Sequence, residues 1–202
     1  MKNKKGVKDF YQLYINKIYC RPVSQQKWES KLNFIHDEKW WENKYKMIFK
    51  LTQDVKIRWF NYRIIHRLLA TNEYLHKIGI EDSSTCDFCN DDIENLQHVF
   101  WECNLVKPIW VELCNWVNQE LDLNISLTLE DVLFGSDIEK ELNNVISLFK
   151  SFIYSSKIKQ TIPSFRGAKM YFLNYKKIDK FIFKGKSKLK TFEKKWGVFY
   201  NL

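Results

Sequence analysis

The chain has 202 residues, of which 33 are Lys or Arg and 24 are Asp or Glu, so its formal net charge is +9. Aromatic residues make up 16% of the chain and supply material for a core. Glycine occurs 6 times and proline 3 times, and this low content excludes low-complexity sequence and favours helices over a β-sandwich. No apolar run approaches the roughly 20 residues that a membrane-spanning helix needs, so a membrane span is excluded.

The first half of the chain is predicted to be helical. Residues 1–36 form an N-terminal segment whose structure the pattern leaves uncertain. A firmer helix is predicted over 37–50, where Trp41, Tyr45 and Ile48 recur at i, i+4 and i+7. The longest helical pattern covers 55–80 and has apolar side chains on two faces, so we expect one helix that is buried on two sides.

A basic stripe lies between those two apolar faces. On a helical wheel, Lys56, Phe60, Arg63 and Arg67 fall within about 60° of one another. Cations around an aromatic ring are what a helix offers to a nucleic-acid backbone with a base stacked on the ring, so these four residues are candidate nucleic-acid contacts. The alternative is a solvated seam whose arginines cover apolar neighbours.

The most specific motif is a C-x2-C-x8-H-x4-C array, formed by Cys86, Cys89, His98 and Cys103. Three thiolates and one imidazole complete the tetrahedral shell of Zn²⁺ and leave no open position for a catalytic water. We therefore expect a structural zinc site with these four ligands, and a hydrolase that uses the metal is disfavoured. The turn-forming run 90–92 suits a tight knuckle after the first ligand pair.

The cysteines have two alternative interpretations. Cys86 and Cys89 could be core thiols beside a surface His98, or a disulfide could form. Five cysteines without a signal peptide instead indicate a reducing, intracellular setting, in the nucleus or the cytoplasm. Cys20 and Cys114 remain outside the array, and the helical spacing around Cys114 predicts a buried core thiol.

The segment around the array is acidic. Residues 78–106 contain no Lys or Arg. Seven carboxylates occur there, at Glu81, Asp82, Asp87, Asp91, Asp92, Glu94 and Glu102. Such a segment suits phosphate poorly. A protein-interaction scaffold that docks a basic partner is therefore an alternative to nucleic-acid binding.

The rest of the chain is predicted to form a zinc-binding helical domain over 37–120 and a C-terminal helical region over 121–202. A helix is expected after Cys103, then a loop over 122–134. Ser136 and Glu139 have the spacing of a capping box that opens a helix ending at Pro163, and another helix is expected from Ser164.

The last 37 residues carry the whole excess of positive charge. Residues 166–202 hold 11 Lys or Arg against 2 Asp or Glu, whereas residues 1–165 hold 22 of each. The lysines alternate with aromatic residues, which favours single-stranded nucleic acid; a membrane surface and a solvated helix are the alternatives. The candidate contacts are Lys176, Lys177, Lys180, Lys184, Lys186, Lys188 and Lys190.

Three stretches together resemble one family. They are residues 56–80, the array with its internal pair Phe100 and Trp101, and residues 104–110. They resemble the zinc-binding region that follows the polymerase of LINE-type (non-LTR) retrotransposon reverse transcriptases, most strongly over 55–110. The resemblance implies the same four zinc ligands and a role in holding template RNA, single-stranded DNA or target DNA beside a polymerase domain. A protein-interaction scaffold that docks the polymerase domain is the alternative.

The chain departs from a complete enzyme of that kind. The polymerase hallmark is an aromatic residue, any residue and two aspartates, but the only adjacent aspartates are Asp91 and Asp92, which follow Cys89 and Asn90. No proline precedes an aspartate, so the signature of the associated endonuclease is also missing. We therefore expect a noncatalytic, mainly α module, a helical domain stapled by a small CCHC zinc knuckle.

Overall fold

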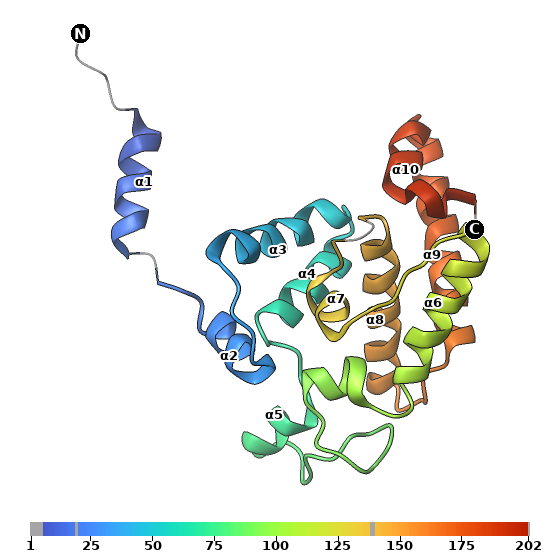
Figure 1. Ribbon diagram of the computed structural model, residues 1–202, viewed down its shortest axis with the longest axis horizontal. Coiled ribbons are helices and arrows are strands. Elements are labelled where there is room, and N and C mark those ends of the chain that lie inside the picture. Colours follow the sequence, from blue (N-terminus) through green and yellow to red (C-terminus); the bar gives the residue numbers. More distant parts are fainter. Residues whose placement is uncertain (1–5, 19, 138–139, 202) are drawn as a thin grey trace. The chain divides into compact units, whose positions relative to one another are not determined.

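The computed structural model of this protein describes residues 6–18, 20–137 and 140–201, and Figure 1 follows them along the chain. Within those ranges the chain is built from helices and contains no strand, only an isolated antiparallel bridge between Thr85 and Ile93. The predicted mainly α fold is therefore confirmed. The chain divides into two compact units, Met1–Asp37 and Glu38–Leu202.

The first unit contains two helices, α1 (Val7–Ile18) and α2 (Val23–Leu32). Helix α2 begins directly after Pro22 and ends at Asn33, whose φ of 53° is the left-handed conformation that asparagine adopts readily at a helix end. An ion pair of 2.9 Å between Arg21 and Glu29 ties the entry of α2 to its second half.

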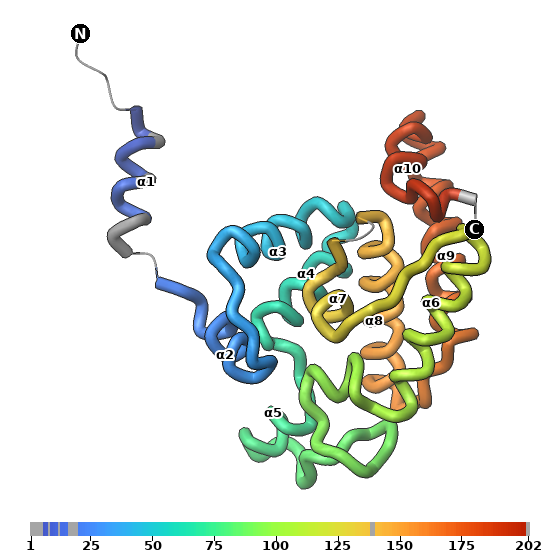
Figure 2. Tube along the Cα trace, viewed as in Figure 1, coloured from blue at the N-terminus to red at the C-terminus, as the bar shows by residue number. Residues whose placement is uncertain are grey.

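The second unit holds the remaining helices. Their bounds are α3 (Glu38–Leu51), α4 (Val55–Ile65), α5 (Asn72–Lys77), the π-helical turn η1 (His98–Glu102), α6 (Lys107–Leu121), α7 (Leu129–Phe134), α8 (Leu142–Ile158), α9 (Phe165–Gly185), α10 (Leu189–Trp196) and the 3-10 turn η2 (Gly197–Asn201). Helix α8 lies at the centre and packs against α4, α7, η1 and α9, as the tube in Figure 2 makes visible. The predicted division at residue 120 falls inside this unit.

The sequence of α8 explains its central place. Val145, Phe149 and Ile153 are fully buried, and their neighbours on the other sides of the helix are buried as well. A helix that is buried on most of its sides is a core helix, and each large apolar side chain buried this way contributes about 1.5–3 kcal/mol. Helix α8 is therefore the frame on which the other elements are placed.

One lysine lies inside this core. The ammonium group of Lys150 donates to the carbonyl of Leu133 at 3.3 Å, and its burial lowers the pKa of Lys150 to about 7. Between about pH 7 and the ordinary lysine pKa of about 10.5, Lys150 is protonated in the unfolded chain and neutral in the folded chain. Lys150 therefore lowers the free energy of unfolding, and it does so most at or below neutral pH.

Replacing Lys150 by methionine is expected to stabilise the protein by about 2 kcal/mol at pH 7, because no charge is then buried. The gain should shrink as the pH rises and should vanish above about pH 10.5, where the unfolded lysine is also neutral. Urea unfolding of both proteins across this pH range measures the difference. An equal gain at every pH would contradict the explanation.

The prediction of one long helix over 55–80 is wrong. Helix α4 ends at Ile65, since Arg67 takes a left-handed conformation with φ of 56°. The amide of Leu68 bonds to the carbonyl of Arg63 at 2.7 Å and that of Arg67 to Ile64 at 2.9 Å, which is a Schellman end. Helix α4 is also buried on one face only, because Val55 and Trp59 are 60% and 58% exposed.

The predicted loop over 122–134 contains the short helix α7. Thr128 and Asp131 form its capping box, in which the Thr128 hydroxyl accepts from the Asp131 amide and the Asp131 carboxylate accepts from the Thr128 amide. The capping box predicted at Ser136 involves Glu139, which lies outside the described residues. Helix α8 begins at Leu142, and Ser136 is instead held by two bonds to the Asn143 side chain.

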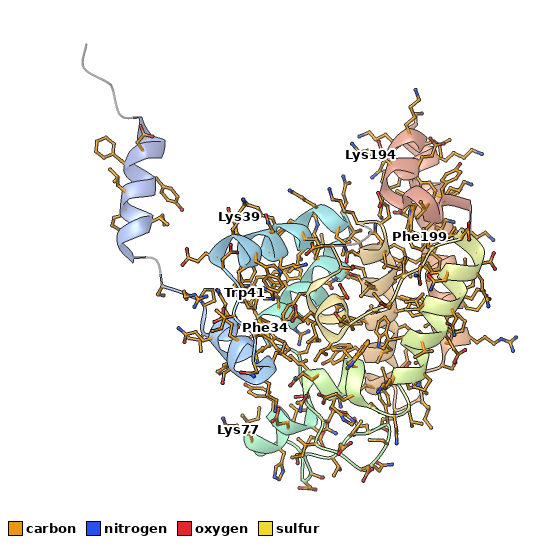
Figure 3. The ribbon with its side chains drawn as sticks, viewed as in Figure 1. Phe34, Lys39, Trp41, Lys77, Lys194 and Phe199 are labelled. Carbon is orange, nitrogen blue, oxygen red and sulfur yellow. The ribbon has the colours of Figure 1, made fainter. Side chains whose placement is uncertain are left out.

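The basic C-terminal residues form packed helices. Helix α9 lies along α8, and α10 folds back on α9. Phe172, Phe192, Trp196 and Phe199 are fully buried, and the rings of Phe172 and Trp196 lie 5.6 Å apart. Figure 3 labels Phe199. Residues 166–202 therefore complete the core while carrying lysines on their surface.

Candidate metal centre

The first pair of cysteines lies in a tight turn. The amide of Cys86 donates to the carbonyl of Asp92 at 2.9 Å, and the amide of Asn90 donates back to the carbonyl of Cys86 at 2.8 Å. Asn90 closes the turn with φ of 54°, a left-handed conformation that asparagine tolerates better than most residues. The turn aims both thiols to the same side.

The second pair comes from the π-helical turn η1. Its hydrogen bond joins the amide of Cys103 to the carbonyl of His98 at 3.0 Å, five residues apart. The side chain of Asn95 accepts from the His98 amide at 3.0 Å and so fixes the start of this turn. An ordinary α-helical turn would rotate Cys103 away from His98, whereas the wider π turn keeps both on one side.

The four side chains meet at one point. Their candidate ligand atoms all lie within 4.8 Å of one another, and the Sγ of Cys89 lies 3.3 Å from the Nε2 of His98. In a tetrahedral site with Zn–S of about 2.3 Å and Zn–N of about 2.0 Å, neighbouring ligand atoms are about 3.5–3.8 Å apart. The cluster thus has the donor set and the spacing of a closed zinc site.

The surroundings of the cluster favour metal binding. Cys86, Cys103 and His98 are buried, and the Nδ1 of His98 lies 3.8 Å from the carboxylate of Asp92, which can orient the imidazole so that Nε2 faces the cluster. The hydrogen bond between the two buried thiols raises the pKa of Cys86 and lowers that of Cys103. A metal ion would displace the remaining thiol protons.

A partly buried ionic network connects this knuckle to α8. The carboxylate of Glu94 is fully buried and accepts from the Asn72 amide at 2.9 Å and the Asp87 amide at 3.3 Å. The ammonium group of Lys157 lies 2.8 Å from Glu94 and 2.5 Å from Asp87, and it donates to the Asn72 side chain at 2.9 Å. This network, named here the Lys157 network, joins α5, the knuckle and the end of α8.

The Lys157 network was not predicted from the sequence. The acidic residues of 78–106 were expected to form one surface, yet Asp87 and Glu94 pair with Lys157. Of the seven carboxylates only Glu94 is buried, whereas Asp87 is exposed although it pairs with Lys157, and Glu81, Asp82, Asp91, Asp92 and Glu102 are exposed as well. A weak signal was present, because a buried lysine such as Lys157 is usually paired with an acidic residue.

The basic stripe predicted on α4 is only partly at the surface. Lys56 and Arg63 are exposed, whereas Phe60 is half-buried and packs edge-on against Phe100 at 6.1 Å. Arg67 is half-buried and lies beyond the end of the helix. The structure therefore does not bring the four residues together on one helix face.

The predicted C-terminal lysines lie mainly at the surface. Lys176 is the exception, since it is buried and its burial lowers its pKa to about 8. The others lie on the second half of α9, in the α9–α10 connection and at the start of α10, and we name them the lysine ridge. Its members are Lys177, Lys180, Lys184, Lys186, Lys188 and Lys190, all exposed.

The remaining cysteines lie apart from the cluster. Cys114 is half-buried on α6 and its burial raises its pKa, while Cys20 is exposed. In the described part of the chain, no helix combines the length and the apolar character that crossing a membrane requires.

These features define a class: a helical domain organised around a closed Cys3His metal centre. Over residues 8–110, half of the chain, the sequence matches the family described as zinc-binding in reverse transcriptase. The chain belongs to this family, and the match extends further towards the N-terminus than the resemblance over 55–110. No curated protein matches the chain. The prediction of zinc is confirmed, because the family and the Cys3His cluster both fit this metal.

Proposed function

We propose that this chain is a noncatalytic module that binds nucleic acid inside the cell and supports reverse transcription of the LINE type beside a polymerase domain. Cys86, Cys89, His98 and Cys103 hold a structural Zn²⁺ in this proposal. The observation that carries it is the lysine ridge, which presents six exposed lysines on a packed helical frame in a chain of this family. RNA and single-stranded or target DNA are the candidate partners.

The lysine ridge suits a phosphate backbone. Its cations stand beside exposed apolar side chains, since Ile178 and Phe181 are 61% and 79% exposed. Each neutralised phosphate releases counterions, so the affinity should fall steeply with salt. Because α9 and α10 form part of the core, the role of the lysine ridge is better tested by point changes than by truncation.

Replacing Lys184, Lys186 and Lys188 by glutamine is expected to weaken binding of a labelled single-stranded RNA about tenfold at low salt. The slope of log affinity against log salt should also fall by about 2, because each phosphate contact on a single strand contributes about 0.7. Fluorescence anisotropy of the zinc-loaded chain across a salt series measures both. Binding that is unchanged in this variant would overturn the role of the lysine ridge.

Neutralising exposed carboxylates of the acidic knuckle should not weaken RNA binding. Asp82→Asn and Asp91→Asn together are expected to leave RNA affinity unchanged or to raise it, because both side chains are exposed and would repel phosphate. Asp92 is kept in this variant, since it lies beside His98. A clear loss of RNA binding would contradict the division between an acidic knuckle and a basic helical surface.

The exposed carboxylates of the knuckle favour a second candidate function, a scaffold that docks a basic protein surface such as a polymerase domain. Glu81, Asp82, Asp91 and Glu102 are all exposed. The same Asp82→Asn, Asp91→Asn variant should then weaken the complex with a separately prepared polymerase domain while RNA binding persists. The two functions are distinguished by which of the two complexes responds.

A further inference from the structure

A groove of about 750 Å³ lies on the second unit, away from the metal centre. Residues of α3 and the α3–α4 connection line it together with the first turn of α8 and residues of α9 and α10. In Figure 1 the end of α3 and helix α10 lie on either side of the first turn of α8. A bond of 3.2 Å from the Asn144 side chain to the carbonyl of Lys195 joins α8 to α10 there.

The groove is lined with more cations than anions. Carboxylates come from Asp54, Asp137, Glu141 and Asp179, whereas cations come from Lys44, Lys46, Lys50, Arg58, Lys140, Lys194 and Lys195. Most of the carboxylates are already engaged. Asp137 pairs with Lys44 at 2.9 Å, Asp179 pairs with Lys195 at 2.8 Å, and the Tyr175 hydroxyl donates to Asp54 at 3.1 Å.

Some of these cations remain available, and two of them lie on α3 and α10. Lys50 on α3 and Lys194 on α10 are exposed, and neither forms an ion pair within 4 Å with any residue in the described ranges. Figure 3 marks Lys194 on α10. Each of the two helices α3 and α10 therefore contributes one of these lysines to the groove. The groove has a net positive electrostatic potential that would attract an anionic chain.

Aromatic rings lie among these cations. Phe49, next to Lys50, is 58% exposed, and Phe183 lines the groove from α9 with Lys195 5.9 Å from its ring centre. The amides of Asn43 and Gln53 add hydrogen-bonding groups. Cations that track a backbone beside rings on which bases stack are the features of single-strand binding sites.

We infer that this groove binds a short run of single-stranded nucleic acid, with Lys50 and Lys194 contacting phosphates and Phe49 stacking on a base. The inference rests on the proposed function and assigns it a second surface, distinct from the lysine ridge. A duplex fits less well, because its bases are stacked internally and leave nothing for Phe49 to contact.

The test measures binding of a labelled single-stranded RNA to the zinc-loaded full chain. Lys50→Glu with Lys194→Glu is expected to weaken binding at least tenfold at about 100 mM salt and to lower the salt slope by about 1.4. The matched control is Lys107→Glu with Lys159→Glu, which changes the net charge equally at exposed positions outside the groove and outside the lysine ridge. It should change affinity about twofold at most.

A second variant probes the ring without changing charge. Phe49→Ala is expected to weaken single-stranded RNA about fivefold or more and to leave binding of a duplex of the same sequence unchanged. Circular dichroism of each variant confirms that the helices persist. Lys50→Gln with Lys194→Gln replaces the charge-reversed pair if that pair does not fold, and it should weaken binding in the same direction.

The outcomes separate the two proposals. If the full chain binds RNA but the groove pair behaves like the control pair, the groove is not the path of the strand and the proposed function stands. If the groove pair loses binding of adenosine monophosphate but not of RNA, the groove takes free nucleotides and the inference is overturned. If the full chain binds no RNA at low salt, both proposals fall.

Discussion

Removal of zinc, by a chelator or by Cys103→Ser, is expected to destabilise residues 38–202 by about 5 kcal/mol or more, because the binding free energy of a structural zinc is part of the folding free energy. Cys103 is fully buried and η1 packs against α6, α7 and α8, so loss of the ligand should loosen the packing of these helices. Thermal unfolding followed by circular dichroism measures the loss. Hydrogen exchange should accelerate first in residues 72–106.

Two cysteines outside the cluster provide the control. Cys20→Ser and Cys114→Ser should leave the zinc content at one equivalent and change the melting temperature little, since neither thiol lies in the cluster. RNA binding of the zinc-free protein should fall only as the helices lose their packing. A Cys103→Ser protein that keeps its metal and its melting temperature would show that the zinc is held elsewhere.

Lys157→Met is expected to destabilise the protein by about 3–5 kcal/mol, because it leaves two carboxylates of the Lys157 network without their cation, and Glu94 is fully buried. The side chains of lysine and methionine are similar in length, so packing changes little. Chemical denaturation at pH 7 measures the loss. The zinc affinity should fall as well, since Asp87 lies next to Cys86 in the knuckle.

The chain offers a matched control two residues further on. Lys159 is exposed at the end of α8, so Lys159→Met should change stability by less than about 0.5 kcal/mol. Adding Glu94→Gln to Lys157→Met should recover part of the loss, because one unpaired buried charge is then removed. Equal losses for Lys157→Met and Lys159→Met would refute the structural role of the network.

Much of the fold could be predicted because helical periodicity is a local signal. Trp41 and Ile48 recur on one face of α3 and are buried in the structure, and the helix ends within one residue of the predicted bounds. The end of helix α4 at Ile65 could not be predicted from a local sequence signal. The sequence shows no glycine or proline there, and the helix ends because Arg67 itself takes the left-handed conformation.

The metal centre could be anticipated because its ligands lie close together in sequence, where spacing restricts the geometry. Ion pairs between residues that are far apart in the sequence could not be anticipated in this way. Lys157 lies 70 residues from Asp87, and Lys44 lies 93 residues from Asp137. Which carboxylates of the knuckle face inwards depends on where α8 passes, and that is decided by the packing of the whole unit. The groove likewise joins residues of α3 and α10 that no local pattern connects.

The single helix α8 connects the metal centre with the groove. Its first turn supplies Asn143 and Asn144 to the groove, its last turn supplies Lys157 to the knuckle, and its 17 residues span about 25 Å. A rigid rod of this kind transmits displacement along its axis. Loss of zinc is therefore expected to disturb the lining of the groove through α8, even though none of the four metal ligands lines the groove.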